Sequence, residues 1–379
     1  MDFSLSETQR ILQHAVGEFA DRWCPPDVVR RHDEADLYPF EIYDELAKAG
    51  WLGILYPPEY GGAGGCAMDA AIVFEELCKR WVALGLVYHT AAIFPLCILY
   101  FGSEEQKRTH LRDIAEGRTR FAFALTEPNS GSDASALSTR ARRDGDVFVI
   151  NGTKTFISGA DVANRIGLVV RTDPEVPKHR GLSMFLLDTS SPGVRIQPIA
   201  KLGIHGLRTC QIFLDDVRVP ASDVVGKVNE GWQVVLRTLE VERLSIGARC
   251  CGGCQAVIDE AVRYVSQREQ FGQPIGKFQA VQQMIADMET ATQAARLLTY
   301  RLAWMIDNGM PCAREASVVK VFASEAYTRV ATLGVQLLGG YGYTMDFPMQ
   351  RHFRDSKIFE IGGGTSQIQR GIIAKSLGL

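Results

Sequence analysis

Long apolar runs and a strong charge of either sign are both scarce in this chain. We expect no apolar run to reach the roughly 18 residues that a membrane-spanning helix needs, and therefore no membrane insertion. The formal net charge is −3 over 379 residues, which gives no electrostatic basis for binding nucleic acid. The acidic first residues lack the basic and apolar regions of a signal or transit peptide, which predicts a cytoplasmic protein.

Cysteine pairs of the kind that bind metals are missing as well. The nine cysteines are scattered, and most lie in apolar runs, as is typical of reduced core thiols in a cytosol. Cys251 and Cys254 form a C-x-x-C pair, but no second Cys/His pair accompanies it and the surrounding pattern is helical. We therefore predict a structural role for this pair and no metal site.

Three segments with different periodicities divide the chain, which is too long for one ordinary core. Residues 1–120 and 227–379 show helical patterns, whereas residues 121–226 carry short β-type runs separated by turn signals. The clearest helical stretches are 2–21, 41–49, 68–79, 104–116 and 313–338, and the clearest strands are 121–125, 147–150, 168–171, 182–187 and 211–214. The pattern predicts an α+β protein with an N-terminal helical domain, a middle antiparallel β domain and a C-terminal helical domain.

Three consecutive glycines, Gly362–Gly364, form the most distinctive motif. Glycine lets a ligand approach the backbone closely and permits positive φ. Ser366 and Gln369 follow with the spacing of a capping box, which predicts a helix that starts here with free N–H groups. Such a helix start favours the binding of an anion or a carbonyl oxygen.

Several separated segments resemble the signatures of the acyl-CoA dehydrogenases. The matching segments are 126–133, 267–272, 336–342 and 362–368, with weaker support from 58–62 and 215–220. They occur in the family's order over nearly the whole chain. The resemblance implies the family fold, in which the C-terminal domain is a four-helix bundle, and it implies FAD bound between the β domain and the C-terminal helices.

The resemblance also assigns residues around the cofactor. Thr126 and Ser158 match positions whose hydroxyls hydrogen-bond the flavin ring, and Phe156 stands where the family often has Trp. Arg268 and Phe271 match residues that reach the FAD of a neighbouring subunit, which implies a homotetramer built as a dimer of dimers. The cofactor set is completed by Gln336, Gly340, Thr365 and Gln367, and Ser132 matches a position near the acyl-CoA.

Position 363 departs from the family pattern, because the family commonly carries its catalytic glutamate there and this chain has Gly363. The implied reaction is the α,β-dehydrogenation of an acyl-CoA thioester: a carboxylate removes the α-proton while a hydride passes to flavin N5. Gly363 retains its N–H, which in the family polarises the thioester carbonyl. The base must therefore lie elsewhere, or be absent.

Two glutamates in the helical segment 236–246 are candidate bases. Glu240 and Glu242 lie about 200° apart around a helix, so they cannot both face the flavin. Glu240 has Arg237 and Arg243 three residues to either side, which favours solvated ion pairs, whereas the neighbours of Glu242 favour burial and a raised pKa. We therefore predict Glu242 as the base. The Glu242–Arg243 pair resembles the one that carries the base in isovaleryl-CoA dehydrogenase and its relatives.

The glycines also bear on the substrate. Gly362 and Gly363 replace the Tyr and Glu that are usual in straight-chain enzymes, which removes bulk beside the α- and β-carbons. We therefore expect a branched, cyclic or otherwise bulky acyl group, with Gly362 and Arg243 at the substrate. Arg80, His89 and Thr90, on or near a helix that could floor the acyl pocket, hint at a polar acyl tail; the simpler interpretation is that they are exposed or satisfied helix residues.

Other functions fit the same sequence. The chain could be a non-catalytic FAD-binding partner in a hetero-oligomer, having lost its base. It could also be an enoyl-CoA reductase, an oxidase, or an enzyme acting on carrier-protein thioesters. Since no second redox motif is present, the resemblance implies an external electron acceptor, namely an electron-transferring flavoprotein, and a place in fatty acid or amino acid catabolism.

Overall fold

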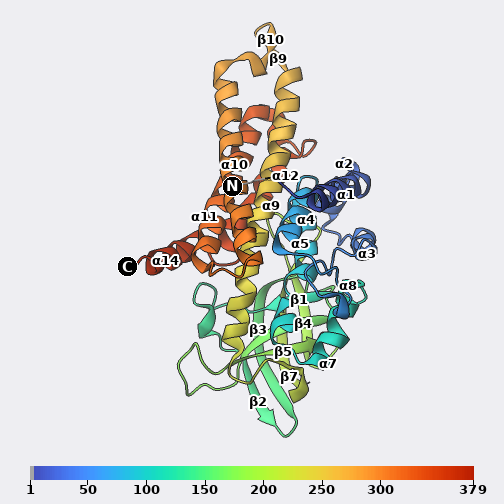
Figure 1. Ribbon diagram of the computed structural model, residues 1–379, viewed down its shortest axis with the longest axis vertical. Coiled ribbons are helices and arrows are strands. Elements are labelled where there is room, and N and C mark those ends of the chain that lie inside the picture. Colours follow the sequence, from blue (N-terminus) through green and yellow to red (C-terminus); the bar gives the residue numbers. More distant parts are fainter. Residues whose placement is uncertain (1–3) are drawn as a thin grey trace.

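A computed structural model describes residues 4–379, with the elements arranged along one long axis. The large sheet lies at one end, the N-terminal helices lie beside the middle, and the long C-terminal helices run from the sheet to the opposite end (Figure 1). This is the predicted order of helical, β and helical regions.

Eight short helices make up the N-terminal region. They are α1 (Glu7–Trp23), α2 (Pro26–Ala35), α3 (Phe40–Lys48), α4 (Ala67–Cys78), α5 (Val82–Ala92), α6 (Leu96–Phe101), α7 (Glu104–Gln106) and α8 (Arg112–Ala115). α1 begins at Glu7 rather than at residue 2, because the Ser6 hydroxyl accepts from the Gln9 N–H and caps the helix there. Residues 2 and 3 of the predicted helix lie outside the described residues.

The expectation about apolar runs was wrong for one stretch. Residues Val82–Phe101 are long and apolar enough to cross a membrane by length and composition, but 83% of that window is buried inside the protein. Pro95 separates α5 from α6 within it. Because its apolar surface is already covered by other helices, this stretch is a core element.

The middle region is one mixed sheet rather than the antiparallel sheet that the strand runs suggested. Its order is β6-β7-β3-β2-β4-β5-β8, with β1 beside β4. Strands β1 and β2 run parallel to β4, and the other pairs are antiparallel. The strands are β1 (Phe121–Ala124), β2 (Arg140–Asp144), β3 (Val147–Ser158), β4 (Arg165–Arg171), β5 (Leu182–Asp188), β6 (Val194–Ile199), β7 (Thr209–Pro220) and β8 (Val224–Val225).

Three long helices form the C-terminal bundle and connect the two ends of the molecule. α9 (Gly231–Gln267), α10 (Gln279–Asp307) and α11 (Ala313–Leu338) pack against one another, and α14 (Ser366–Ser376) packs on α11 as the short fourth helix. The hairpin β9 (Glu269–Gln270) and β10 (Gln273–Pro274) joins α9 to α10 at the far end (Figure 1). α12 (Met349–Ser356) and α13 (Ile358–Ile361) lead to the glycine run.

The C-G-G-C sequence lies inside α9 and serves close helix packing. Cys251 and Cys254 are fully buried. A β-carbon at Gly252 would stand 2.3 Å from the Glu75 carbonyl oxygen on α4, and one at Gly253 would stand 2.6 Å from the Tyr327 ring on α11. The two glycines therefore let α9 approach both neighbours, as the predicted structural role requires.

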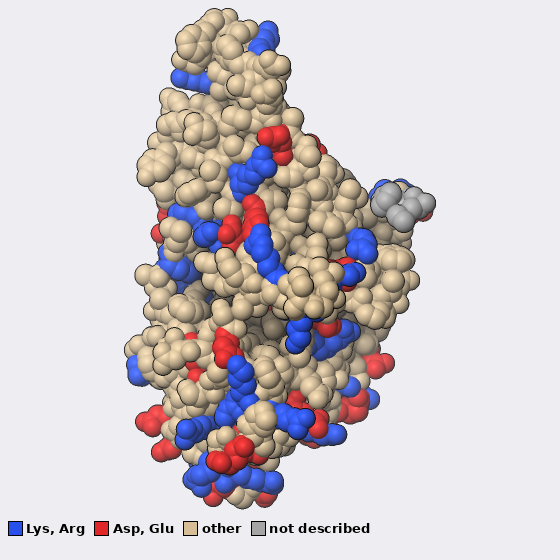
Figure 2. All heavy atoms as spheres, turned by 90° about the vertical axis from the view of Figure 1, so that its left-hand side faces the viewer, with Lys and Arg blue, Asp and Glu red and all other residues tan. Residues whose placement is uncertain are grey.

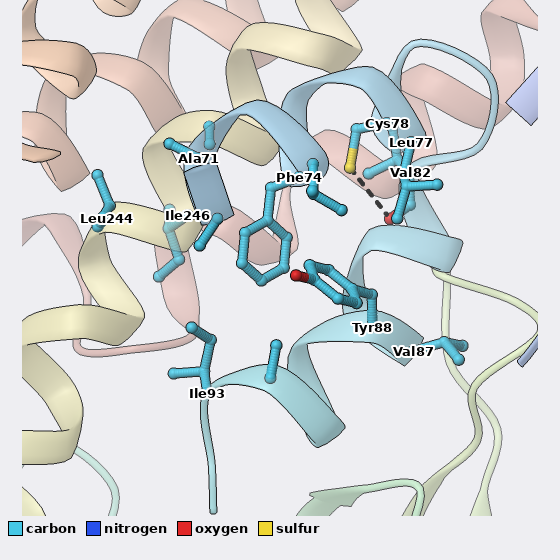
Figure 3. Packing of buried hydrophobic residues seen from close by; sticks show 14 of the residues in the cluster. Ala71, Phe74, Leu77, Cys78, Val82, Val87, Tyr88, Ile93, Leu244 and Ile246 are labelled. Atoms are coloured by element: carbon cyan, nitrogen blue, oxygen red, sulfur yellow. Dashed lines mark hydrogen bonds between the residues drawn. The ribbon is translucent and has the colours of Figure 1, made fainter. Parts of the chain in front are cut away.

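One apolar core joins the N-terminal helices to the bundle. Phe74 of α4 and Tyr88 of α5 have ring centroids 4.6 Å apart, and Figure 3 shows them beside Ile246 of α9. A second core fills the sheet. The first core fixes α5 against the middle of α9, the part of that helix that carries Glu242.

Candidate active site

Glu242 and Gly363, 121 positions apart in the sequence, meet in the structure. A β-carbon built on Gly363 would lie 3.5 Å from Glu242 Oε1 and 3.6 Å from its carboxyl carbon. Gly363 has φ +66°, in the left-handed region that favours glycine. The carboxylate of Glu242 therefore lies beside the position that a side chain at residue 363 would occupy.

The side chain of Gln369 fixes the glycine run through hydrogen bonds to its carbonyl oxygens. Its Nε2 donates to the Gly363 carbonyl oxygen at 2.9 Å and to the Gly364 carbonyl oxygen at 3.4 Å. The Gly363 N–H has no hydrogen-bond partner within residues 4–379. With its carbonyls tied on one side, the run presents a free backbone donor next to the Glu242 carboxylate.

The capping box predicted for Ser366 and Gln369 was wrong. Thr365 is the N-cap of α14, and its hydroxyl accepts from the Ile368 N–H at 3.3 Å. Ser366 is the first helical residue, and its side chain is buried. Sequence spacing marked the helix start to within one residue, but the Gln369 side chain turned to the glycine carbonyls instead of to the cap.

The Glu242 carboxylate makes no hydrogen bond or ion pair within the described part of the chain. Burial raises its pKa above the usual range, against the opposing pull of the cations Arg249, Arg243 and Lys320. Lys320, on α11, is fully buried, its Nζ has no hydrogen-bond partner among the described residues, and burial lowers its pKa to about 8. A carboxylate that is unpaired and raised in pKa suits proton abstraction.

Glu240 points elsewhere, as helix geometry predicted. Its carboxylate accepts from Arg237 Nη1 at 2.8 Å in a half-exposed i,i+3 ion pair. Arg243, the other predicted partner, is buried instead, and its Nε has no partner within residues 4–379. Both Glu242 and Glu240 act electrostatically on the Arg243 guanidinium, against the effect of its burial.

The β-domain residues predicted to contact the flavin gather at one end of β3. The Thr126 carbonyl accepts from the Thr155 N–H at 2.9 Å, which fixes the turn after β1 against β3. Phe156 sits in a bulge of β3 with φ +59° and is 64% exposed, and Ser158 ends the strand opposite Thr209. An exposed aromatic ring held at positive φ is a strained feature that fits a surface for a planar ligand.

A buried ion pair that the sequence analysis did not identify supports this turn. Lys154 Nζ donates to Glu127 Oε1 at 2.8 Å and to the Leu125 carbonyl at 3.0 Å, and both side chains are buried. Glu127 also accepts from Ser138 and Thr139. Attraction by the Lys154 ammonium lowers the pKa of Glu127 to about 2. The pair flanks Thr126 on both sides and holds it in place.

A second group of predicted cofactor residues lies at the opposite end of the bundle. Arg268, Gln336 and Gly340 line one groove of about 500 Å³, and the guanidinium of Arg268 lies over the Tyr341 ring. Phe271, at the tip of the β9–β10 hairpin, is 93% exposed (Figure 1). These residues lie at the end of α9 that is far from the sheet and from Thr126.

The remaining predicted residues occupy exposed or open positions. Ser132 is exposed in the loop after β1, Gln367 is exposed in the first turn of α14, and Gly362 has open space around a built β-carbon except for the Ile358 carbonyl at 3.5 Å. One residue at the site was missed: Lys320 carries no local motif, since its effect on Glu242 arises only when α11 packs against α9. Gln369 was expected in a capping box and instead binds the glycine carbonyls.

Each of the two groups fits one part of FAD. The groove offers Arg268 for a pyrophosphate and glycine backbone for close approach, and the end of β3 offers hydroxyls and an exposed ring for a flavin. The two groups lie at opposite ends of α9.

Comparisons with known proteins agree over the whole chain. Models of the acyl-CoA dehydrogenase N-terminal, middle and C-terminal domains match residues 6–118, 122–217 and 229–378. A probable acyl-CoA dehydrogenase of Bacillus subtilis is 38% identical over 100% of both chains, and a 3-(aryl)acrylate reductase of Clostridium sporogenes is 37% identical over 98% of this chain and 99% of its own.

Solved structures show the same architecture. Butyryl-CoA dehydrogenase of Megasphaera elsdenii superposes with a TM-score of 0.96 at 34% identity, covering 100% of each chain. FAD is the cofactor of such enzymes, and the two residue groups described above fit it. The chain therefore belongs to the acyl-CoA dehydrogenase family and is an FAD-dependent oxidoreductase.

Proposed function

We propose that the chain catalyses the α,β-dehydrogenation of an acyl-CoA thioester, with Glu242 as the base. The observation that carries this proposal is the 3.5 Å separation between Glu242 Oε1 and a β-carbon built on Gly363. It places a carboxylate next to the backbone donor that a thioester carbonyl needs. The lost side chain at position 363 is thereby replaced from α9, as the resemblance to isovaleryl-CoA dehydrogenase implied.

The chain's own residues divide the work of the reaction. The Gly363 N–H donates to the thioester oxygen and stabilises the negative charge that develops there. Glu242 removes the α-proton, and the cations Arg249, Arg243 and Lys320 favour its ionised form against the larger effect of burial. Bound FAD supplies the hydride acceptor. Thr126 and Ser158 orient the ring, and Phe156 packs on it.

The open space beside Gly362 supports a bulky acyl group. A side chain at Gly362 would meet only the Ile358 carbonyl, at 3.5 Å, so the space is open in this chain. At Gly363, by contrast, Ile246 and Glu242 lie 2.7 and 3.5 Å from a built β-carbon. A branched or cyclic acyl group uses the space that a larger residue at position 362 would fill.

Surface composition supports assembly into a homotetramer. Figure 2 shows charges of both signs crowded at the β-domain end, while the upper part of the same face is largely uncharged. Apolar side chains exposed at the hairpin end of the bundle include Phe271, Tyr341 and Tyr343. Burial of this surface by another copy would bring Arg268 and Phe271 to its cofactor. We further propose a cytoplasmic enzyme that passes electrons to an electron-transferring flavoprotein.

The deciding experiment compares Glu242→Gln with Glu240→Gln. Anaerobic bleaching of the flavin by branched, cyclic and straight acyl-CoA substrates is followed for each protein. Loss of a general base lowers the rate by about 100- to 10,000-fold, so Glu242→Gln should be nearly inactive and Glu240→Gln should match wild type.

Three outcomes would contradict parts of the proposal. Full activity of Glu242→Gln would remove Glu242 from the mechanism. A wild-type protein that holds FAD but is bleached by no thioester would favour a non-catalytic partner subunit, or, if enoyl thioesters re-oxidise its dithionite-reduced flavin, a reductase. Preference for straight short acyl groups would overturn the bulky substrate.

A further inference from the structure

His89 is buried between α5 and α9, next to the turn of α9 that follows Glu242. The ring is fully enclosed, and its Nδ1 lies 2.9 Å from Ser245 Oγ. Its Nε2 has no hydrogen-bond partner among residues 4–379. Since buried polar atoms are nearly always paired, an open ring nitrogen here marks the place of a missing partner. Thr90, by contrast, is satisfied by the Val87 carbonyl, and Arg80 pairs with Asp21 at the surface.

The hydrogen-bond network indicates which ring nitrogen carries the proton. Ser245 Oγ donates its one hydrogen to the Glu242 carbonyl at 2.7 Å, and it accepts from Arg249 Nη2 at 3.3 Å. Burial, with Arg249 nearby, moves the pKa of His89 well below its usual value, so the ring is neutral. The proton therefore lies on Nδ1, donated to Ser245, and Nε2 is left as a bare acceptor.

Aromatic rings connect this acceptor to the flavin end of the β domain. The His89 ring lies between Phe74, with centroids 6.1 Å apart, and Phe94, at 4.5 Å and edge-on. Phe94 in turn stacks on Phe123 of β1, three residues before Thr126. Phe94 is only half-buried, and it lies between the imidazole and Phe123.

The charge around His89 indicates which kind of group can donate a hydrogen bond to its Nε2. A hydroxyl and an ammonium can both donate to a ring nitrogen. The Arg249 guanidinium is bonded to the same Ser245 hydroxyl and has no acidic partner within hydrogen-bond distance in residues 4–379. A second buried cation beside it would be repelled, whereas a neutral hydroxyl would not.

We propose that His89 selects the acyl group: its Nε2 accepts a hydrogen bond from a hydroxyl at the distal end of the acyl chain or ring once Phe94 turns aside. This rests on the proposed function, because it concerns the substrate of the same site. Ser245 positions the imidazole and connects it to the backbone of Glu242. The substrate class is thus a hydroxylated acyl thioester.

The test uses pairs of thioesters that differ only in one hydroxyl. Hexanoyl-CoA is paired with 6-hydroxyhexanoyl-CoA, butanoyl-CoA with 4-hydroxybutanoyl-CoA, and 3-phenylpropanoyl-CoA with its 4-hydroxyphenyl analogue. Flavin bleaching gives kcat/KM for each with wild type, His89→Leu and Tyr88→Phe. Tyr88 is the matched control, since it is the neighbouring residue on α5 and its hydroxyl is also buried without a partner among the described residues.

We expect wild type to prefer the hydroxylated member of at least one pair by about 10- to 100-fold, because an unpaired buried acceptor is costly. His89→Leu should lose that preference while retaining or improving turnover of the plain partner, and Tyr88→Phe should keep it. Equal rates within every pair in wild type would overturn the role of His89 but leave the proposed function standing. A preference lost in Tyr88→Phe and retained in His89→Leu would also overturn it. If no thioester bleaches the flavin, both proposals fail.

Discussion

The carboxylate of Glu242 lies 3.5 Å from the point where a β-carbon on Gly363 would stand. Two positions far apart in sequence thus share one volume, and a carboxylate can reach that volume from either backbone. The catalytic carboxylate can therefore be attached to the chain at position 242 or at position 363. In both cases the substrate and the Gly363 N–H keep their places.

This relationship predicts that the base can be moved. In the variant Glu242→Gly/Gly363→Glu, activity toward straight acyl-CoA should recover to well above that of Glu242→Gly alone. Recovery will be partial, because a glutamate at φ +66° carries about 1–2 kcal/mol of strain. Adding Ile246→Val removes the Ile246 methyl that lies 2.7 Å from a β-carbon built on Gly363, and this should increase the recovery of activity. Rates that stay at the level of Glu242→Gly in all combinations would show that the two positions are not interchangeable.

The pH dependence should move when Lys320 is neutralised. Abstraction needs ionised Glu242, so kcat/KM falls as pH drops through its pKa, and burial places that fall above the range of a free glutamate. Lys320→Met removes a cation that lowers this pKa, so the acid limb should shift to higher pH. Lys320 has no hydrogen-bond partner within residues 4–379, so the variant should fold well. If the acid limb of the kcat/KM profile stays at the same pH, Lys320 does not influence the pKa of Glu242.

Local geometry explains which features the sequence revealed. Helix periodicity alone separated Glu240 from Glu242, since residues two apart on any helix face different ways. It also gave α11 its observed limits. Strands β2 and β6 were missed because their side chains are mostly charged or exposed, and only pairing with β3 and β7 defines them. The open acceptor of His89 exists only after α5 packs on α9, so no local pattern could show that it lacks a partner.

The Glu127–Lys154 pair should determine the stability of the turn that carries Thr126. Lys154→Met leaves the Glu127 carboxylate buried without its cation, which costs about 3–5 kcal/mol of unfolding free energy. Urea unfolding measures this loss, and Glu127→Gln/Lys154→Met should regain part of it. The depressed pKa of Glu127 stabilises the fold above about pH 4.5, and that contribution is lost as pH falls toward 2. A Lys154→Met variant of wild-type stability would show that the pair is dispensable.

Arg268 should control FAD retention through the assembly rather than through its own chain's flavin site. Arg268→Ala removes a charge-assisted contact to a pyrophosphate, so FAD affinity should fall about 10- to 100-fold. Arg263→Ala is the control, because Arg263 lies on the same helix and pairs with Glu260 at the surface. Mixing Arg268→Ala with Thr126→Val subunits makes the sharper test. If one cofactor is shared by two chains, mixed dimers keep one site with both residues intact and recover flavin binding that neither variant shows alone. If mixing the two variants restores no flavin binding, each cofactor is bound by a single chain.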